Sequence, residues 1–497
     1  MRIISCVSNT MTSQRPAHPA HPATSERVRR ALGRGVAFRR RRQRLADLLE
    51  ALALATLLAV VAQFLVNGGS HDLLTGAAGD RLTAVGRLTG LLAMDLLLVQ
   101  LVLAARVPWV DRVYGMDRAL KAHRVLGRVT VPLVLVHVGT IVVGAAIGDG
   151  RTGPGGALRE LLVMVTGGDD LLMAGVATLL LVVIAVTSVQ IARRRLGYEA
   201  WHVVHLTAYA AVVLSVPHEL SLGSDFTASP WTRGYWWSLW LLVAGSVLLW
   251  RVALPVVRSA RHGLRVDRVV EESDGVWSVV MRGRHLNRLD VRAGQFFNWR
   301  FVTPGLLLSA HPWSLSAAPD ERSLRITVRG LGDHSAAVRH LKPGTFVLAE
   351  GPYGAFTTRA RVRRQVLLIA AGIGVTPVRA LLEELVREGH ALPGDVHVLY
   401  RADAPDQLPL HGELERLADL AGHRLQTLVG PPVVGSLLPA GAGGGGSDAS
   451  RLARLVPGLA GHEVYLCGPP AWMSLVHRAV ERAGVPRTHI HDERFGW

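Results

Sequence analysis

Six long apolar segments in the first half of the chain constrain its fold more than any other feature. They cover residues 48–66, 88–105, 125–147, 171–192, 200–216 and 236–257 of the 497 residues. An α-helix needs about 20 apolar residues to cross the hydrocarbon core of a bilayer, and most segments are near that length, although the fifth is short. The sequence therefore predicts six membrane-spanning helices that contact membrane lipid.

Basic residues gather on one side of these segments if each segment crosses the membrane once. They lie within residues 26–44, 106–121, 193–195 and 251–261. Positively charged loops stay in the cytoplasm, so we expect a multi-pass protein of the plasma (cytoplasmic) membrane with both termini cytoplasmic. This topology accounts for much of the net charge of +17, and nucleic acid is not expected as a partner.

Residues 1–45 contain Pro, Ala, Ser and His without periodicity and end in the arginine run FRRRRQR. This composition is typical of a disordered tail whose basic end contacts the cytoplasmic membrane surface. A signal peptide is the alternative, but the apolar segment begins near residue 48, which is too late. We therefore expect a disordered basic tail at 1–45 and a membrane domain at 46–258.

The second half of the chain reads as two soluble domains. Short alternating runs such as VWSVVM and SLRITVRG predict a small antiparallel β-barrel at 259–358. From residue 359, strands such as QVLLIA and VHVLY alternate with helical stretches such as ALLEELVREG, which predicts an α/β nucleotide-binding domain at 359–497. The expected fold is thus multidomain: a six-helix bundle, a β-barrel and an α/β domain.

Two histidine pairs in the apolar half are the candidate metal ligands. His123 and His137 are 14 residues apart in the third segment, which is about 21 Å along a helix and within about 40° of one face. His205 and His218 are 13 apart, about 19 Å, with His218 just past the outer end of the fifth segment. Because alternate spans run in the same direction, His123 should face His205 and His137 should face His218. Ionisable residues in a span are costly, and axial ligation of two stacked haems would explain them.

The rotational phase leaves this assignment open. Thirteen steps on an ideal helix place His205 and His218 about 140° apart, unless Pro217 breaks the helix and reorients the second ring. His202 is the rival inner ligand. Asp95, in the second segment, could assist the outer haem or a proton path, or could have a hydrogen-bonded structural role.

The histidine spacings, H-x13-H in one span and H-x12-H two spans later, resemble those of the ferric reductase and NADPH oxidase superfamily. The resemblance implies two b-type haems in the membrane and FAD in the barrel. The chain has only two cysteines, Cys6 and Cys467, whereas an iron–sulfur cluster normally needs four thiolates.

The string HPWSLS resembles the flavin motif of that superfamily. It consists of His311, Pro312, Trp313, Ser314, Leu315 and Ser316. The resemblance implies that Trp313 lies against the isoalloxazine and that the Ser314 hydroxyl reaches its N5. Downstream, Gly332, His334 and Ser335 precede a short helix, whose N–H groups could meet the phosphates of FAD.

Two further strings resemble the nicotinamide-binding loops of ferredoxin reductase-like domains. In AGIGVTP, Gly372 and Gly374 permit a tight turn and close approach to a pyrophosphate, followed by Thr376 and Pro377. In YLCGPP, the resemblance places Cys467, Gly468 and Pro469 beside the nicotinamide. A buried structural thiol is the alternative reading of Cys467.

The resemblance also places Arg401 against the 2′-phosphate of NADPH, because an arginine fork suits a phosphate dianion. Asp403 would suit the bare ribose of NADH, so NADPH is favoured and NADH stays open. The chain ends in HIHDERFGW, where the resemblance implies that Phe495, or alternatively Trp497, covers the flavin.

Together these features predict an NAD(P)H-dependent transmembrane oxidoreductase. Electrons would pass from cytoplasmic NAD(P)H through FAD and two haems to an outer acceptor, and no acid–base dyad is required because the cofactors carry the chemistry. A ferric iron or ferric chelate is the first choice of acceptor, and oxygen giving superoxide is the second. The alternative is a membrane-tethered flavin or ferredoxin reductase without haem that serves a soluble protein partner.

Overall fold

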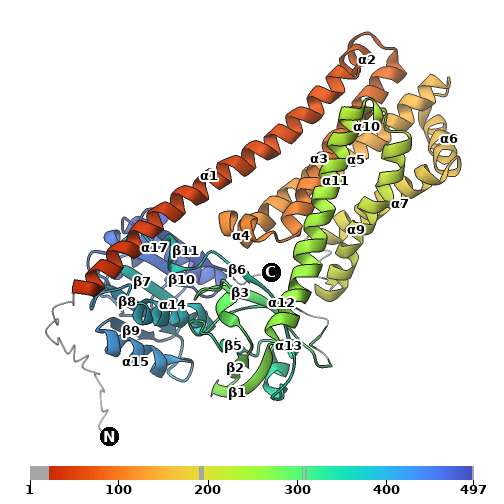
Figure 1. Ribbon diagram of the computed structural model, residues 1–497. Helices are drawn as coiled ribbons and strands as arrows, with labels where there is room; N and C mark the ends of the chain where they lie inside the picture. Colours follow the sequence, from red (N-terminus) through yellow and green to blue (C-terminus); the bar gives the residue numbers. More distant parts are fainter. Residues whose placement is uncertain (1–21, 190–194, 197, 305, 308–309, 495–497) are drawn as a thin grey trace, which may run out of the picture.

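The computed structural model describes residues 22–189, 195–196, 198–304, 306–307 and 310–494. A helical bundle occupies one end of the molecule, and the soluble domains lie together at the other (Figure 1). Among the described residues, six helices are long and apolar enough to cross a membrane, which confirms the six predicted spans. The elements that contain them are α1 (Pro22–Val66), α3 (Ala78–Ala104), α5 (Met116–Gly148), α7 (Asp169–Ser188), α9 (Tyr198–Ser221) and α11 (Pro230–Val247).

The last span does not end with α11. A π-helical stretch, η1 (Leu248–Ala253), leads directly into α12 (Leu254–His262), which descends to the barrel. Short helices connect the other spans: α2 (Gly69–Thr75), α4 (Pro108–Tyr114), α6 (Gly153–Thr166) and α10 (Ser224–Thr227). Helices α3 and α5 share the most extensive contact in the bundle. The spans also expose large apolar side chains such as Leu54, Leu179 and Leu241, as expected of a surface that faces lipid.

The N-terminal tail differs from the expectation. Residues 22–45, expected to be disordered, form the first half of the 45-residue helix α1, while residues 1–21 lie outside the described residues. Arginine is the commonest residue in this stretch and has high helix propensity, as do its alanines. The membrane span that follows supplies a preformed helix to extend, so the unfavourable nucleation step is avoided.

The barrel consists of two three-stranded antiparallel sheets. Their strand orders are β1-β2-β5 and β4-β3-β6. The strands are β1 (Arg265–Ser273), β2 (Val276–Arg282), β3 (Phe296–Phe301), β4 (His311–Ser314), β5 (Ser323–Arg329) and β6 (Val347–Tyr353), and the helix α13 (Asp333–Ala337) follows β5. Side chains such as Phe297, Trp299 and Ile326 fill the core between the sheets.

The α/β domain is built on a five-stranded parallel sheet with the order β11-β10-β7-β8-β9. Its strands are β7 (Val366–Ala371), β8 (Val396–Ala402), β9 (Arg424–Val429), β10 (Glu463–Cys467) and β11 (Ile490–Glu493). Its helices are α14 (Val375–Arg387), α15 (His411–Ala421), α16 (Asp448–Leu455) and α17 (Pro470–Arg482). Every residue of β7 is buried, as expected of a central parallel strand.

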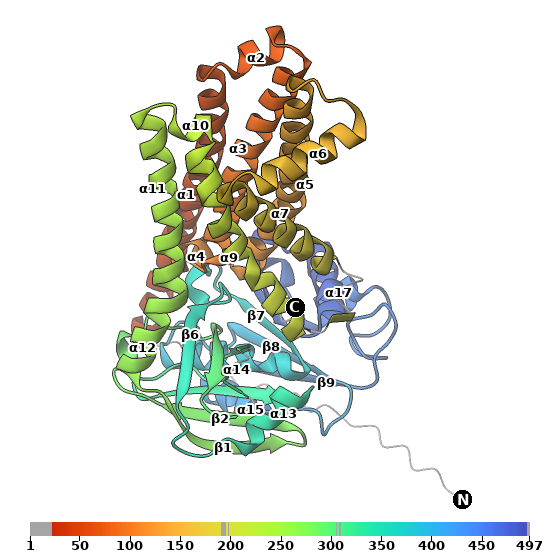
Figure 2. The same ribbon diagram turned by 90° about the vertical axis from the view of Figure 1, so that its right-hand side faces the viewer.

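The strand order reverses at β7, because the chain proceeds from β7 to β8 and β9 on one side and returns to β10 and β11 on the other. Ligands of open α/β sheets bind at the carboxyl ends of the strands beside such a switch point. The predicted nucleotide loops follow β7 and β10, so the fold brings both to this crevice. Figure 2 shows the barrel directly beneath the bundle, with β6 reaching toward α4.

Candidate functional site

The four predicted histidines meet in two pairs between α5 and α9. The ring centres of His123 and His205 are 6.0 Å apart, and those of His137 and His218 are 6.5 Å apart. A metal–imidazole bond is about 2 Å long, so two rings bound to opposite sides of one iron have centres about 6 Å apart. The side chains present therefore fit two ligated irons, and the pairing is the one that the spacing predicts.

Helix α3 fixes the ring orientation of both histidines on α5. His137 Nδ1 donates to the carbonyl of Gly86 at 2.8 Å, and His123 Nδ1 lies 3.3 Å from the carbonyl of Gln100. A carbonyl oxygen only accepts, so in each ring Nδ1 carries the proton and Nε2 keeps its lone pair. Metal-bound histidines have this kind of backbone partner, which selects the tautomer and orients the ring.

A glycine on α3 makes this close approach possible. A Cβ atom at Gly90 would lie 2.6 Å from His137 Nδ1, which is shorter than any normal contact. His137 therefore packs directly against the α3 backbone. Sequence reasoning missed Gly86 and Gly90, although the glycine spacing in the GRLTG stretch was the available signal.

The fifth span differs from the expectation at its outer end. His218 lies inside α9, which continues to Ser221, and not past the end of the helix. Proline already has helical φ, so α9 can run through Pro217 with the loss of one backbone hydrogen bond. That missing bond is also the feature that permits a local change of phase.

His202, the alternative inner ligand, and the buried carboxylate of Asp95 both lie outside the two histidine pairs. His205, not His202, lies across from His123, and Trp201 stacks on His205 with ring centres 5.0 Å apart. Asp95 is buried and accepts a hydrogen bond from the Thr56 hydroxyl at 3.3 Å, which links α3 to α1. This contact supports the structural role for Asp95.

The predicted flavin strand is β4, at the centre of a small aromatic cluster. The rings of His311 and Trp313 stack 5.0 Å apart, and His334 lies 5.4 Å from His311. The segment that begins α13 thus lies beside β4, and the short helix predicted after Gly332 is present. Trp313 also packs toward the barrel core beside Phe301. Its contact with the flavin stays a prediction.

Two buried polar atoms beside β4 have no hydrogen-bond partner among the described residues. They are the Ser314 hydroxyl and the side-chain amide nitrogen of Asn298. Asn298 pairs with Pro312 and Ser314 with Phe296, so both side chains lie on the same face of the sheet. Buried polar groups are rarely left unpaired, so this face fits a ligand with polar edges such as a flavin. Sequence reasoning missed Asn298, although it belongs to the FFNW stretch before the motif.

The remaining flavin positions have structural partners. Leu315 is fully buried in the barrel core, and Ser316 accepts hydrogen bonds from Arg325 and Thr327. The Gly332 N–H donates to the Ser335 hydroxyl at 3.0 Å, so it is internally capped and not free as expected. A phosphate at this helix would have to displace that hydroxyl.

The two predicted nucleotide loops touch each other. A Cβ atom at Gly374 would lie 2.3 Å from the carbonyl oxygen of Cys467, although the two residues are far apart in sequence. Gly372 has φ +53°, which favours glycine at the turn. Thr376 donates to the Ile373 carbonyl at 3.1 Å, and Pro377 lies in the first turn of α14.

Cys467 is the buried end of β10, and Gly468 and Pro469 follow it. Burial raises the pKa of the Cys467 thiol, reinforced by the charge of Glu493. The thiol is therefore protonated at neutral pH, and a protonated thiol is a poor nucleophile.

The predicted phosphate-binding arginine has a partner in this structure. Arg401 lies at the carboxyl end of β8 and forms an ion pair with Asp403 at 3.0 Å. This ion pair is compatible with either NADPH or NADH as the bound nucleotide, as the sequence is. Phe495 and Trp497 lie outside the described residues.

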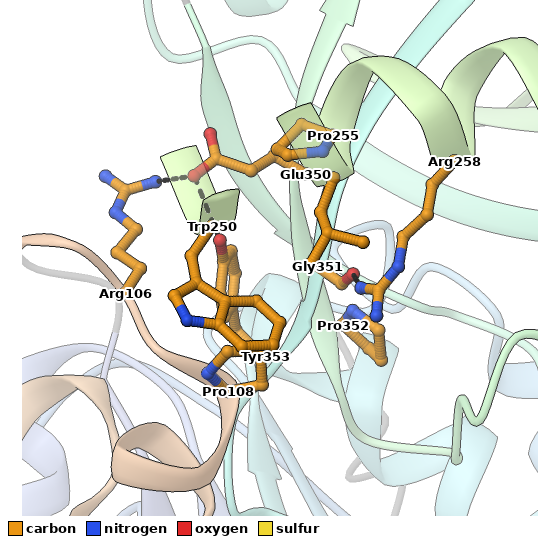
Figure 3. Close-up of a pocket in the computed structure, with 10 residues that line it drawn as sticks. Arg106, Pro108, Trp250, Pro255, Arg258, Glu350, Gly351, Pro352 and Tyr353 are labelled. Atoms are coloured by element: carbon orange, nitrogen blue, oxygen red, sulfur yellow. Dashed lines mark hydrogen bonds and ion pairs between the residues drawn. The ribbon is translucent and has the colours of Figure 1, made fainter. Parts of the chain in front are cut away.

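A cluster that sequence reasoning missed joins the barrel to the bundle (Figure 3). Glu350 of β6 is buried and forms ion pairs of 3.2 Å with Arg106 and with Arg251. The hydroxyl of Tyr353 donates to the same carboxylate at 2.9 Å, and Arg258 donates to the Gly351 carbonyl at 2.9 Å.

Burial alone would raise the pKa of Glu350, but the nearby guanidinium groups outweigh it and the pKa is lowered. Glu350 is therefore ionised at neutral pH. The two arginines, Arg251 and Arg106, are 99 and 244 residues away from Glu350 in sequence, so no local pattern could have revealed the cluster.

The chain matches two protein families. Residues 89–216 match the family "Ferric reductase like transmembrane component", and residues 368–478 match "Oxidoreductase NAD-binding domain". The first match includes His123, His137 and His205 and ends two residues before His218.

Individual relatives match the soluble half. A ferredoxin–NADP reductase B from Sorangium cellulosum is 30% identical over 41% of this chain and 84% of that protein. The ferredoxin reductase component of a 3-ketosteroid-9-alpha-monooxygenase from Mycolicibacterium smegmatis is 31% identical over 47% of this chain. The match covers 65% of that relative's length.

Among solved structures, the flavohem-like FAD/NAD-binding domain of nitric oxide dioxygenase from Vibrio cholerae is 27% identical, with a TM-score of 0.39. That similarity covers 48% of this chain and 99% of that structure. By its similarity to the Sorangium reductase, the soluble half of the chain belongs to the ferredoxin–NADP reductase-type oxidoreductases, which bind FAD and NAD(P)H, and it is joined to a ferric reductase-like transmembrane component.

Proposed function

We propose that this protein moves electrons from cytoplasmic NAD(P)H through FAD and two b-type haems to an acceptor on the outer side of the plasma membrane. The observation that carries the proposal is the pair of histidine contacts at 6.0 and 6.5 Å between α5 and α9. In each contact the histidine on α5 uses Nδ1 as a donor and keeps the lone pair of Nε2, which fits two axially ligated irons.

When bound, FAD accepts a hydride and releases single electrons, which haem irons relay. The residues of this chain hold and orient these groups. His123 and His205 would hold the inner haem, and His137 and His218 the outer one. The crevice beside β7 would receive the nicotinamide nucleotide, with Gly374 and Cys467 lining it.

The topology supports a cytoplasmic source of electrons. The basic half of α1 and the basic ends of α11–α12 lie at the same end of the molecule as both soluble domains. Positive residues stay on the cytoplasmic side, so NAD(P)H would be oxidised there and both termini would be cytoplasmic. The pair His137 and His218 then lies nearer the outer surface.

A ferric chelate is the acceptor that we favour. An open depression of about 350 Å³ lies beside the outer end of α5, between Val143 and Ala157, with Arg151 in its lining. It begins six residues, about 9 Å, beyond His137 along the helix. Arg151 is paired there with Glu160 and Asp149 and the lining is mostly apolar, so the preference for a ferric chelate rests on the resemblance to ferric reductases and not on this depression. Superoxide production from oxygen is the competing outcome.

The names of the soluble relatives favour a second candidate function. Several are reductase components of monooxygenase or dioxygenase systems. On this reading the present chain would be a membrane-tethered reductase without haem that serves a soluble protein partner.

The test uses sealed inside-out vesicles that contain the full-length protein, with NADPH added outside and candidate acceptors enclosed. We expect reduction of an enclosed ferric chelate, and a loss of at least about tenfold in His137→Ala, whose NADPH-to-dye activity on the cytoplasmic side is unchanged. Unaltered transmembrane reduction in His137→Ala would contradict the haem path. Protein that binds flavin, shows no Soret absorption and keeps full activity toward a soluble partner would favour the tethered reductase.

A further inference from the structure

The cytoplasmic half of α1 has one face that docks on the soluble domains. Val28, Gly35, Arg39 and Arg42 follow one another at intervals of seven, four and three residues, which places them on one side of the helix. Val28 and Gly35 are buried although this part of α1 lies outside the apolar segment. Figure 1 shows this half of α1 crossing the α/β domain before it enters the bundle.

Gly35 is the closest point of this contact. A Cβ atom at Gly35 would lie 1.8 Å from the carbonyl oxygen of Arg361. Only glycine permits this approach, since every other side chain would collide with backbone. On the same helix, Gly33 is exposed, and a Cβ atom there would meet no atom of the described chain within 4 Å.

Arg39, one turn further on, joins three segments. Its Nε donates to the Ala360 carbonyl at 2.6 Å, and its guanidinium pairs with the carboxylate of Glu463. Glu463 begins β10 and is fully buried. Its other oxygen accepts the N–H groups of Val362 and Arg363 at 3.1 and 3.2 Å. One buried carboxylate therefore ties α1 to β10 and to residues 360–363.

Residues 354–365 are the connection between the barrel and the α/β domain, because β6 ends at Tyr353 and β7 begins at Val366. A helix docked on this connection contacts the joint between the two soluble domains. The orientation of that joint decides where the nucleotide crevice faces.

The contacts of α1 then continue onto the bundle. Arg42 donates to the Val113 carbonyl at 2.6 Å, and the Tyr114 hydroxyl donates to the Ala46 carbonyl at 3.1 Å. Both partners lie on α4, whose Asp111 accepts the N–H of Gly354 at 3.0 Å. The helix itself runs without interruption into the first membrane span, as one rod of 45 residues.

We propose that the cytoplasmic half of α1 is a strut that sets the orientation of the two soluble domains against the bundle. Gly35 and Arg39 are positioning residues for electron transfer from the flavin to the inner haem site. This inference rests on the proposed function, which requires the flavin and the inner haem to stay at a fixed separation. A simple membrane anchor would need neither a buried glycine nor an arginine paired with a fully buried carboxylate.

The test compares Gly35→Leu with Gly33→Leu in the full-length holoprotein. Both changes add the same side chain to the same helix, but only the first collides with Arg361. The first readout is limited trypsin digestion after Arg361, because this arginine is buried and its carbonyl lies against Gly35 of the docked helix. We expect cleavage there to accelerate about tenfold or more in Gly35→Leu and to stay unchanged in Gly33→Leu.

The second readout separates two electron-transfer steps in anaerobic stopped-flow measurements. We expect flavin bleaching by NADPH to stay within about twofold in Gly35→Leu, while haem reduction slows about tenfold or more. Haem and flavin content should be unchanged. Arg39→Gln should show the same split more weakly, Arg39→Lys should restore part of the rate, and the exposed neighbour change Arg40→Gln should have no effect.

Each other outcome decides a different claim. If Gly35→Leu resists trypsin and reduces haem as Gly33→Leu does, α1 is not a strut. If flavin bleaching falls as far as haem reduction, α1 supports the folding of the nucleotide domain and the positioning role is wrong. If the unaltered protein bleaches flavin but never reduces haem, the proposed function fails, while the trypsin comparison still decides whether α1 is docked.

Discussion

At the scale of single residues, the candidate haem sites depend on how closely α3 approaches the histidines of α5. The carbonyl of Gly86 accepts from His137 Nδ1, and Gly90 leaves room for the ring. Backbone atoms of α3 thus orient His137, and no side-chain motif in the sequence indicates this contact. Changing the glycine, and not the histidine, tests whether this orientation matters.

Gly90→Ala should displace the ring of His137, because the new Cβ would lie 2.6 Å from Nδ1. Overpacking of this kind forces side chains out of their preferred positions at a cost of about 1–3 kcal/mol. We expect the outer haem to be lost and the inner one kept, so that haem per flavin falls by about half. Pyridine haemochrome and flavin assays measure this ratio.

The control for this change is Gly245→Ala on α11, where the added methyl group meets no described atom within 4 Å. It should keep the ratio of the unaltered protein. An unchanged ratio in Gly90→Ala would show that the α3 contact does not orient a ligand.

Asp111 gives a pH-dependent prediction at the interface of α4 with the barrel. Burial raises the pKa of Asp111 to about 6. The folded protein therefore holds this proton more tightly than the unfolded chain, and the stability that the group contributes is lost as the pH rises from about 4 to 6. Above pH 6 the buried charge costs on the order of 2–3 kcal/mol.

Asp111→Asn should remove that cost while its side-chain oxygen still accepts the N–H of Gly354. We expect the melting temperature of the variant to exceed that of the unaltered protein more at pH 7.5 than at pH 5. The exposed change Asp274→Asn should give no such difference. A gain that is the same at both pH values would contradict the titration of Asp111.

At the scale of elements, the shape of α9 determines whether His205 and His218 can both face the histidines of α5. An ideal helix would place His205 and His218 about 140° apart, yet both rings lie within 6.5 Å of a histidine on α5. Pro217 is the one break in the hydrogen-bond ladder between them that the sequence provides.

Pro217→Ala should restore the missing backbone hydrogen bond and straighten the last turn of α9. We expect the His218 ring to turn away from His137, so that the outer haem signal in the reduced-minus-oxidised spectrum weakens while the inner signal persists. Pro230→Ala is the control, because a proline in the first turn of α11 displaces no helix hydrogen bond. Two unaltered haem signals in Pro217→Ala would mean that the proline does not set the phase.

Much of this architecture could be predicted from periodicity alone. Helices that span lipid and central parallel strands are encoded by runs of local residues, so the six spans and the strand QVLLIA were recognisable. The pairing of His123 with His205 followed from depth, because membrane helices share one axis. The predicted disorder of the basic tail was wrong for residues 22–45, which are helical. Composition does not reveal that a neighbouring membrane span nucleates the helix.

At the scale of the whole molecule, the contacts between domains could not be predicted. The Glu350 cluster and the docking of Gly35 on Arg361 join residues separated by hundreds of positions. These contacts are made by isolated Arg, Glu and Gly residues, which occur throughout the sequence. They can therefore be identified only once the fold is known. They hold the nucleotide crevice, the barrel and the inner histidine pair in one arrangement, which is what a continuous electron path requires.

The central claim is that the two histidine pairs hold two haems in one chain with one flavin. The most direct measurement is the haem-to-flavin ratio and the optical spectrum of the full-length protein, purified after expression with ample haem supply. The account predicts about two haems per flavin with the spectrum of iron ligated by two imidazoles. A protein that binds flavin but shows no Soret absorption would contradict it.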